Sequence, residues 1–180
     1  MVLVRAGSTS AFDQLLNAFW EPLVRYAARQ LGDLDVAKDI VQDGFIQVWD
    51  RRGTWSPVGC ARAYLYKVVR SLVIDEQRRR LVRLRWAGRS RLEEHPTPPT
   101  PIQLLGEAEL RLAYERALRK LPARRREAFV LVRLRGLSHE EAAEVMGISA
   151  QTVANQMSAA LAELRSALEP LINSTGEPES

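Results

Sequence analysis

The stretch SHEEAAEVMGISAQTVANQMSAALAELRSAL, residues 138–168, carries the signals for two short helices joined by a turn. Ser138 and Glu141 have the spacing of a capping box, which satisfies free N–H groups where a helix begins. Gly147 permits the left-handed conformation that ends this helix, and Ser149 can cap the next one. The pattern predicts a helix-turn-helix, whose second helix enters the major groove of DNA. An ordinary helical hairpin is the alternative that these residues leave open.

The second predicted helix, residues 149–168, combines one apolar stripe with a polar face that has little charge. The apolar residues recur at spacings of three and four and are expected to be buried: Val153, Met157, Ala160, Leu161, Leu164 and Leu168. The opposite face carries Gln151, Thr152, Asn155, Gln156, Ala159 and Ala162. Because Asn and Gln can each form two hydrogen bonds with adenine, Asn155 and Gln156 are the expected base readers.

Length and composition restrict the class of protein. The chain has 180 residues, of which 46% are hydrophobic and 27% are charged, and this is an ordinary soluble balance. No stretch approaches the roughly 20 apolar residues that cross a bilayer, and no signal peptide is evident, so we expect a cytoplasmic protein without membrane insertion. The sequence shows no metal-binding cluster, nucleophile–base pair or phosphate-binding glycine loop. It predicts no catalytic residue, no metal and no cofactor, and therefore a protein that is not an enzyme.

Charge is unevenly distributed along the chain. Residues 62–91 contain ten basic and two acidic side chains, and a second basic segment covers residues 116–135. Residues 136–180 contain one basic and seven acidic side chains, and the first 50 residues are also acidic. A charged run is often only a solvated face. Alternating runs suit a protein that offers cations to a polyanion and carboxylates to a different partner.

The composition changes at residues 93–101, EEHPTPPTP, which are too rich in proline for a helix. Helical spacing of apolar residues occurs on both sides, in residues 12–26, 36–49, 64–73 and 110–121, and Pro122 is expected in the first turn of a helix over 123–135. We predict an all-α fold of two small helical domains. The expected boundaries are residues 8–90, a linker at 91–106, residues 107–172 and a disordered tail at 173–180.

Two segments together resemble the extracytoplasmic-function (ECF, group IV) sigma factors of bacterial RNA polymerase. AKDIVQDGFIQVW, residues 37–49, is similar to region 2.2 of that family, which has a D-[IL]-V-Q-[ED]-x-F core. LPARRREAFVLVRLRGLSHEEAAEVMGISAQTV, residues 121–153, is similar to region 4. The order and separation of both motifs in a chain of this size identify it as a member of the family.

The resemblance implies roles for the first domain. Region 2.2 of the family docks on the clamp of the polymerase, which points to Asp39, Gln42, Asp43 and Gln47, although these residues could simply keep the helix soluble. Regions 2.3 and 2.4 melt the -10 element and hold one strand, by aromatic stacking and by cations on phosphates. The corresponding residues are Trp55, Tyr64, Lys67, Arg70, Ser71, Arg78, Arg79 and Arg80, and Tyr66 is a further aromatic there. Trp55 and Tyr64 are alternatively core residues. Ser71 stands where the family commonly has Asn, so we expect different base reading at that position.

The second domain is expected to bind the -35 element, with one departure from the family. The residues assigned to this contact are Ser149, Gln151, Thr152, Asn155, Gln156 and Ala159. The family commonly has cations in this helix, whereas residues 152–160 read TVANQMSAA. The preceding helix carries five cations: Arg124, Arg125, Arg126, Arg133 and Arg135. We expect them to supply the missing attraction to phosphates, although some of them could contact the polymerase flap instead.

The resemblance thus implies an alternative sigma factor for promoter recognition and transcription initiation. Its expected partners are the clamp and flap of core RNA polymerase and promoter DNA, and the family also implies an anti-sigma factor. No homo-oligomer is expected. One alternative is a stand-alone helix-turn-helix regulator that binds operator DNA as a dimer, which leaves residues 37–49 unexplained. Another is a protein-interaction module that no longer binds DNA.

Overall fold

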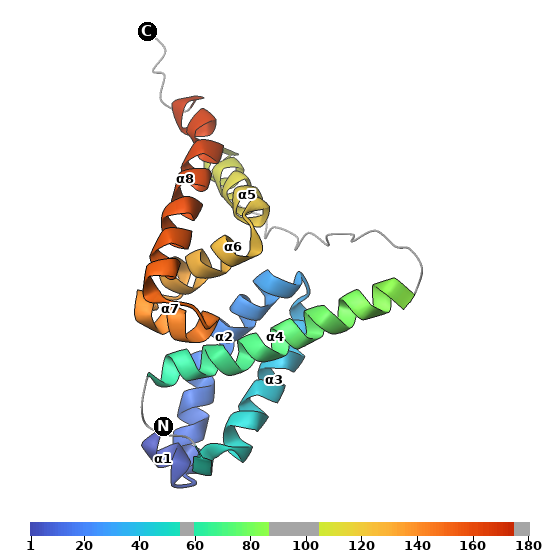
Figure 1. Cartoon of the computed structure of the whole chain (residues 1–180), viewed down its shortest axis with the longest axis vertical. Helices are drawn as coiled ribbons and strands as arrows, with labels where there is room; N and C mark the ends of the chain where they lie inside the picture. Colours follow the sequence, from blue (N-terminus) through green and yellow to red (C-terminus); the bar gives the residue numbers. More distant parts are fainter. Residues whose placement is uncertain (55–59, 87–104, 175–180) are drawn as a thin grey trace. The chain divides into compact units, whose positions relative to one another are not determined.

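Figure 1 shows the computed structural model. It describes the backbone of residues 1–54, 60–86 and 105–174, and the side chains of these residues except 105–109 and 171–174. Within these ranges the chain is helical and contains no strand, so the predicted all-α class is confirmed. The chain divides into two compact units, Met1–Thr97 (unit 1) and Pro98–Ser180 (unit 2). Their boundary lies in the proline-rich segment predicted as a linker, residues 93–101, which is outside the described residues.

In residues 1–54 and 60–86, unit 1 contains four α-helices and a short 3-10 helix. These are α1 (Val2–Arg5), α2 (Thr9–Leu31), α3 (Leu34–Asp50), η1 (Arg52–Thr54) and α4 (Ala61–Trp86). The sequence did not predict α1, because four residues are too few to show a helical period. Val4 of α1 is buried, so unit 1 includes residues before the predicted start at residue 8.

A sharp corner joins α2 to α3. Gly32 has a left-handed backbone with φ of 69°, and its N–H donates to the carbonyl oxygen of Ala28, which ends α2. Asp33 then caps α3, because its Oδ1 accepts hydrogen bonds from the backbone N–H groups of Asp35 and Val36, both at 3.1 Å. Such a side-chain cap typically contributes about 1 kcal/mol. The corner makes α2 and α3 pack as neighbours.

The core of unit 1 lies between α2, α3 and α4. Tyr26 of α2 and Tyr66 of α4 are both fully buried and meet edge to face, with ring centroids 5.3 Å apart. This geometry is the one that aromatic pairs favour. Tyr66 is therefore a core residue, and the prediction that it offers its ring for base stacking is wrong. Val41 of α3 and Val69 of α4 are also buried in this core.

Gly44 allows α3 and α4 to approach closely. A Cβ atom built at Gly44 would lie 3.1 Å from Cγ2 of Val69 and 3.7 Å from Cδ1 of Leu72. Gly44→Val adds two further methyl groups to this contact, and overpacking of this kind typically costs 1–3 kcal/mol. We expect a loss of about 2 kcal/mol in the free energy of unfolding, measured by denaturant titration. Gly53→Val is the control, because no atom lies within 4 Å of its added Cβ. Equal stability of the two variants would contradict the assigned close approach.

Unit 2 contains α5 (Leu105–Lys120), α6 (Ala123–Phe129), the π-helix η2 (Val130–Leu134), α7 (His139–Met146) and α8 (Ala150–Ser174). The core forms where α5, α6 and α7 pack against α8, and it contains Leu118, Phe129, Leu131, Val145 and Val153. The predicted helix over residues 123–135 is α6 followed by the π-helix, and Pro122 occupies the N-cap position, just before the first turn. The start of α5 at Leu105 lies within the predicted linker, 91–106.

Two predictions about α8 are wrong. Leu161 is 46% exposed, because at about 100° per residue it lies roughly 70° from the centre of the stripe formed by Val153, Met157, Ala160 and Leu164. The helix also continues past Leu168 to Ser174, with Pro170 inside it, so the first two residues of the predicted disordered tail are helical. A proline removes one backbone donor, and in the last turns of a helix that loss leaves the earlier hydrogen bonds intact.

Candidate functional site

The helix-turn-helix predicted from residues 138–168 is present in α7 and α8. Ser138 and Glu141 form the capping box, with the N–H of Glu141 donating to Ser138 Oγ at 3.1 Å and the N–H of Ser138 donating to Glu141 Oε2 at 2.8 Å. Gly147 ends α7 with φ of 67°. A hydrogen bond with its own backbone and one with Ser138 lower the pKa of Glu140, so the start of α7 favours a carboxylate.

The outer face of α8 carries amide and hydroxyl groups that form hydrogen bonds with one another. Gln151 and Asn155 are exposed, and Gln151 Nε2 donates to Asn155 Oδ1 at 3.1 Å. Ser149 Oγ lies 2.8 Å from Thr152 Oγ1 and accepts a hydrogen bond from the Thr152 N–H. Thr152, Gln156 and Ala159 are half-buried. The exposed centre of the predicted -35 surface is therefore Gln151 with Asn155, rather than Asn155 with Gln156.

The five arginines expected to support this surface differ in their surroundings. Arg125 of α6 is ion-paired with Glu163 of α8, and Arg126 donates to the carbonyl oxygen of Arg119 at 3.0 Å. Arg135 is half-buried, whereas Arg124 and Arg133 are exposed. Arg125 and Arg126 thus hold α6 in place, and Arg124 and Arg133 are the two that present their charge to solvent.

In unit 1, the residues predicted to bind the polymerase lie along the outer side of α3. Asp39, Gln42 and Asp43 are exposed, and Gln47 is half-buried. Beside them is an apolar groove of about 220 Å³ between α2 and α3, lined by Phe12, Leu16, Trp20, Gln42, Phe45, Ile46 and Trp49. Sequence reasoning missed this groove. The available signal was Ile46, an apolar residue on the same side of the helix as Asp39 and Asp43, and it is 50% exposed.

The predicted -10 residues on α4 fall into an outer and an inner set. Lys67, Ser71 and Arg78 are exposed, whereas Tyr64 and Arg70 are half-buried and each makes further contacts. Trp55 lies outside the described residues. The spacing of Lys67, Ser71 and Arg78 places them on one stripe of the helix, which faces away from α2 and α3.

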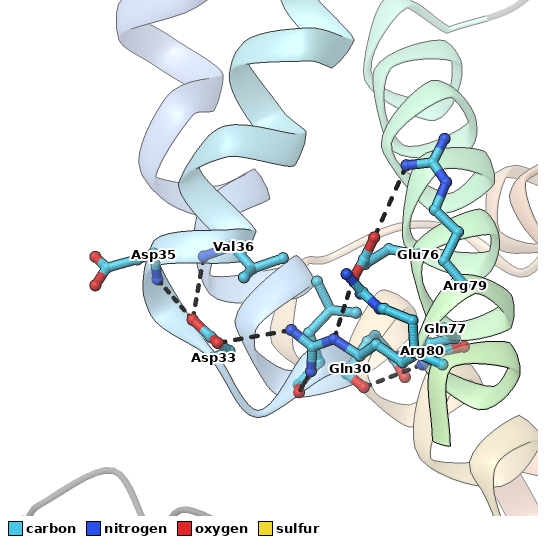
Figure 2. A network of polar contacts seen from close by, with 10 residues as sticks. Gln30, Asp33, Asp35, Val36, Glu76, Gln77, Arg79 and Arg80 are labelled. Atoms are coloured by element: carbon cyan, nitrogen blue, oxygen red, sulfur yellow. Dashed lines mark hydrogen bonds and ion pairs between the residues drawn. The ribbon is translucent and has the colours of Figure 1, made fainter. Parts of the chain in front are cut away.

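Arg80 belongs to a polar network that joins α4 to the corner between α2 and α3 (Figure 2). Its guanidinium donates to the carbonyl oxygen of Leu31 at 2.9 Å and pairs with Glu76 at 3.3 Å and with Asp33 at 3.6 Å. Beside it, Gln77 Nε2 donates to the carbonyl oxygen of Gln30 at 3.1 Å. Arg80 therefore positions α4, because its guanidinium binds groups at the corner between α2 and α3 and does not point to solvent.

Arg80 and Arg78 provide a matched pair of variants that tests whether Arg80 holds α4 at the corner. Arg80→Ala removes the side-chain donor to the carbonyl oxygen of Leu31 and the cation shared by Glu76 and Asp33, so we expect a loss of about 1–3 kcal/mol in the free energy of unfolding. Arg78 is 75% exposed and its ion pair with Asp75 contributes little, so Arg78→Ala should change stability by about 0.5 kcal/mol or less. Denaturant titration of both variants checks this prediction. Equal destabilisation would show that Arg80 does not hold the corner.

Comparisons with known proteins match these elements to named regions. Residues 15–81 match the family Sigma-70 region 2, and residues 111–164 match Sigma-70, region 4. The ECF RNA polymerase sigma factor SigL of Mycobacterium tuberculosis is 31% identical over 172 residues, covering 92% of this chain and 96% of SigL. The chain belongs to the ECF sigma factor family. This sigma factor is also 32% identical over 174 residues to CnrH of Cupriavidus metallidurans, covering 91% and 90% of the two chains.

Other relatives are longer or were solved with a bound protein. The sigma factor is 29% identical to SigE of Mycolicibacterium smegmatis but spans only 60% of its length. The structure of CnrH in complex with the cytosolic domain of CnrY has a TM-score of 0.67 at 27% identity, covering 94% of each chain. RpoE of Bartonella quintana, solved with the anti-sigma factor NepR, has a TM-score of 0.70 at 24% identity and covers 89% and 98%, which supports the fold.

The matched regions correspond to specific helices of the sigma factor. Region 2 runs from α2 to residue 81 of α4, although α4 continues to Trp86, and region 4 covers most of α5 to α8. In the part of the chain that the structure describes, no helix is long and apolar enough to span a membrane. The same residues contain no group of three or more His, Cys, Asp and Glu side chains able to hold a metal ion.

Proposed function

We propose that this sigma factor directs bacterial RNA polymerase in the cytoplasm to a particular set of promoters. The observation that carries the proposal is the presence of both promoter-related regions in one chain, residues 15–81 and 111–164. The chain acts as a dissociable subunit without chemistry of its own. Unit 1 binds the polymerase clamp and the -10 element, and unit 2 binds the -35 element and the flap.

Binding to the polymerase uses the outer side of α3. Asp39 and Asp43 are exposed carboxylates one helical turn apart, and they pair with basic side chains of the clamp. Gln42 and Gln47 supply amide hydrogen bonds beside them. The apolar groove lined by Ile46 adds a surface that gains stability when a partner covers it. Charged groups around an apolar centre are the usual composition of a specific protein interface.

Promoter binding is divided between charge and hydrogen bonding. Lys67, Arg70, Arg78 and Arg79 neutralise phosphates near the -10 element, while Ser71, Tyr64 and Trp55 contact bases of the opened strand. On α8, Gln151 and Asn155 read the -35 element. Arg124 and Arg133 supply the cations that α8 lacks, which is supported by their exposure on α6 and the π-helix.

An anti-sigma protein is proposed as the regulator. Two similar sigma factors were solved with a bound protein, CnrH with the cytosolic domain of CnrY and RpoE with the anti-sigma factor NepR. A protein that covers the outer side of α3 would compete with the polymerase clamp for the same carboxylates. The sigma factor itself acts as a monomer.

Reconstitution with core RNA polymerase tests the proposal against its alternatives. The purified chain is mixed with core enzyme, and binding and transcription from promoter fragments are measured together. We expect stable binding and initiation that depends on the added chain. Binding without initiation would favour a protein-interaction module. Absence of binding, with a footprint of the chain alone on palindromic DNA, would favour a stand-alone regulator.

A further inference from the structure

The C-terminal end of α4 extends past the core of unit 1 (Figure 1). Gln77 and Arg80 hydrogen-bond α4 to the corner between α2 and α3. Beyond them Leu81, Val82 and Trp86 are exposed by 53%, 50% and 87%, and only Leu84 is half-buried. The match to region 2 ends at residue 81, so the family comparison assigns no role to this end of the helix.

The extension continues the cationic stripe of α4. Lys67, Ser71, Arg78, Val82 and Arg85 succeed one another at spacings of three, four or seven residues, so they lie along one side of the helix. Trp86, the last residue of α4, follows Arg85 and lies about 100° further around the helix. At about 1.5 Å per residue, the distance from Lys67 to Trp86 is about 28 Å, the length of roughly eight phosphates along one strand.

The cations at this end of α4 differ in what they already bind. Arg79, Arg80 and Arg83 all pair with Glu76, at 3.8, 3.3 and 2.6 Å. Arg85 is exposed and makes no ion pair with any residue that the structure describes. Its charge is therefore available to a partner, and the large exposed ring of the next residue, Trp86, offers that partner an apolar contact.

We propose that Arg85 and Trp86 extend the promoter-binding surface of α4, with Arg85 on a phosphate and Trp86 stacked on an unpaired base of the opened DNA. A cation next to an exposed aromatic ring is the combination with which proteins hold single strands, because every base has a face for stacking. Lys67, Arg78 and Arg85 place three cations on one side of the helix, which favours a polyanion over a protein partner. The inference rests on the proposed function, because it places a further contact on the same DNA.

The test uses holoenzyme assembled from core polymerase and the full-length chain. The probes are a fluorescent promoter fragment, selected by transcription from a random library, with the -10 region unpaired, and the same fragment fully paired. Trp86→Ala should weaken binding to the unpaired probe about 10-fold and to the paired probe much less, while Trp86→Phe should keep most of the affinity. Arg85→Ala should lower the slope of log affinity against log salt by about 1. Arg25→Ala removes an exposed cation from α2 and should leave this slope unchanged.

Several outcomes would overturn the inference. Unchanged binding of Trp86→Ala to the unpaired probe would exclude stacking, and weaker assembly with core polymerase would identify a protein contact instead. Because Trp86 is 87% exposed, its removal should not change thermal unfolding, and a lowered melting temperature would mean that the ring serves the fold. Initiation by the wild-type chain is measured first. Its absence would refute the proposed function, whereas normal initiation with an unaffected Trp86→Ala variant would refute only this inference.

Discussion

Reversing two charges on α3, with Asp39→Lys and Asp43→Lys together, is expected to weaken binding to core polymerase by about 100-fold or more. Both carboxylates are exposed on one side of the helix, so the change places two cations against the basic side chains proposed for the clamp. Like charges brought together at an interface cost several kcal/mol, and each 1.4 kcal/mol is a factor of about ten in affinity. Fluorescence anisotropy of labelled protein titrated with core enzyme measures the effect.

The matched control is Glu21→Lys with Glu169→Lys, which makes the same change in net charge. Glu21 is exposed on α2, and Glu169 is exposed on α8. This variant should bind core polymerase within about threefold of wild type, because single exposed charges contribute little. If both double variants lose affinity equally, net charge is responsible and α3 is not the docking surface.

Replacement of Asn155 by Ala should selectively impair promoters that carry the cognate -35 sequence. A bidentate contact between an amide and adenine is worth about 1–3 kcal/mol of discrimination, so we expect transcription to need roughly 10- to 100-fold more holoenzyme. Because Asn155 is exposed, the substitution should leave the stability of unit 2 unchanged, and thermal unfolding checks this point. An equal loss on promoters with unrelated -35 sequences would refute the reading role.

Ser166→Ala provides the control for this position. Ser166 is exposed on α8 three helical turns further along nearly the same face, so its hydroxyl group lies beyond the proposed base contacts. Because Gln151 Nε2 donates to Asn155 Oδ1, Gln151→Ala should also reduce discrimination, and the double variant should lose less than the sum of the two single variants.

Signals that lie within a few neighbouring residues were readable from the sequence. The capping box of Ser138 and Glu141 and the left-handed Gly147 form as predicted, because each depends on local backbone geometry. The apolar spacing also located the long helices. The family motifs then identified regions 2 and 4, because helical periodicity alone could not distinguish them from ordinary helical hairpins.

Features that depend on packing between helices were not readable. Tyr66 was expected to be available for stacking, but contact with Tyr26 from another helix buries it. Arg80 was grouped with Arg78, yet its partners include Leu31 and Asp33, which are distant in sequence. Such partners follow from the packing of α4 at the corner, and a run of three arginines gives no sign of which one turns inward.

The proposal that cations outside α8 supply the attraction to DNA accounts for the weak charge of this helix. Its exposed amides are ordered by a hydrogen bond between Gln151 and Asn155, and the ion pair between Glu163 and Arg125 of α6 holds the helix in unit 2. Attraction to DNA then comes from the stripe on α4 and from Arg124 and Arg133. Unit 2 alone should bind DNA weakly, because counterion release from few phosphates provides little affinity.

The most direct test of the central claim is to map the 5′ ends of transcripts made from fragmented genomic DNA by core polymerase with and without the full-length chain. We predict discrete start sites that appear only with the chain and share one -10 and one -35 sequence at a constant separation. Asn155→Ala should reduce the preference for that -35 sequence. Identical transcripts with and without the chain would contradict its assignment as a promoter-specificity subunit.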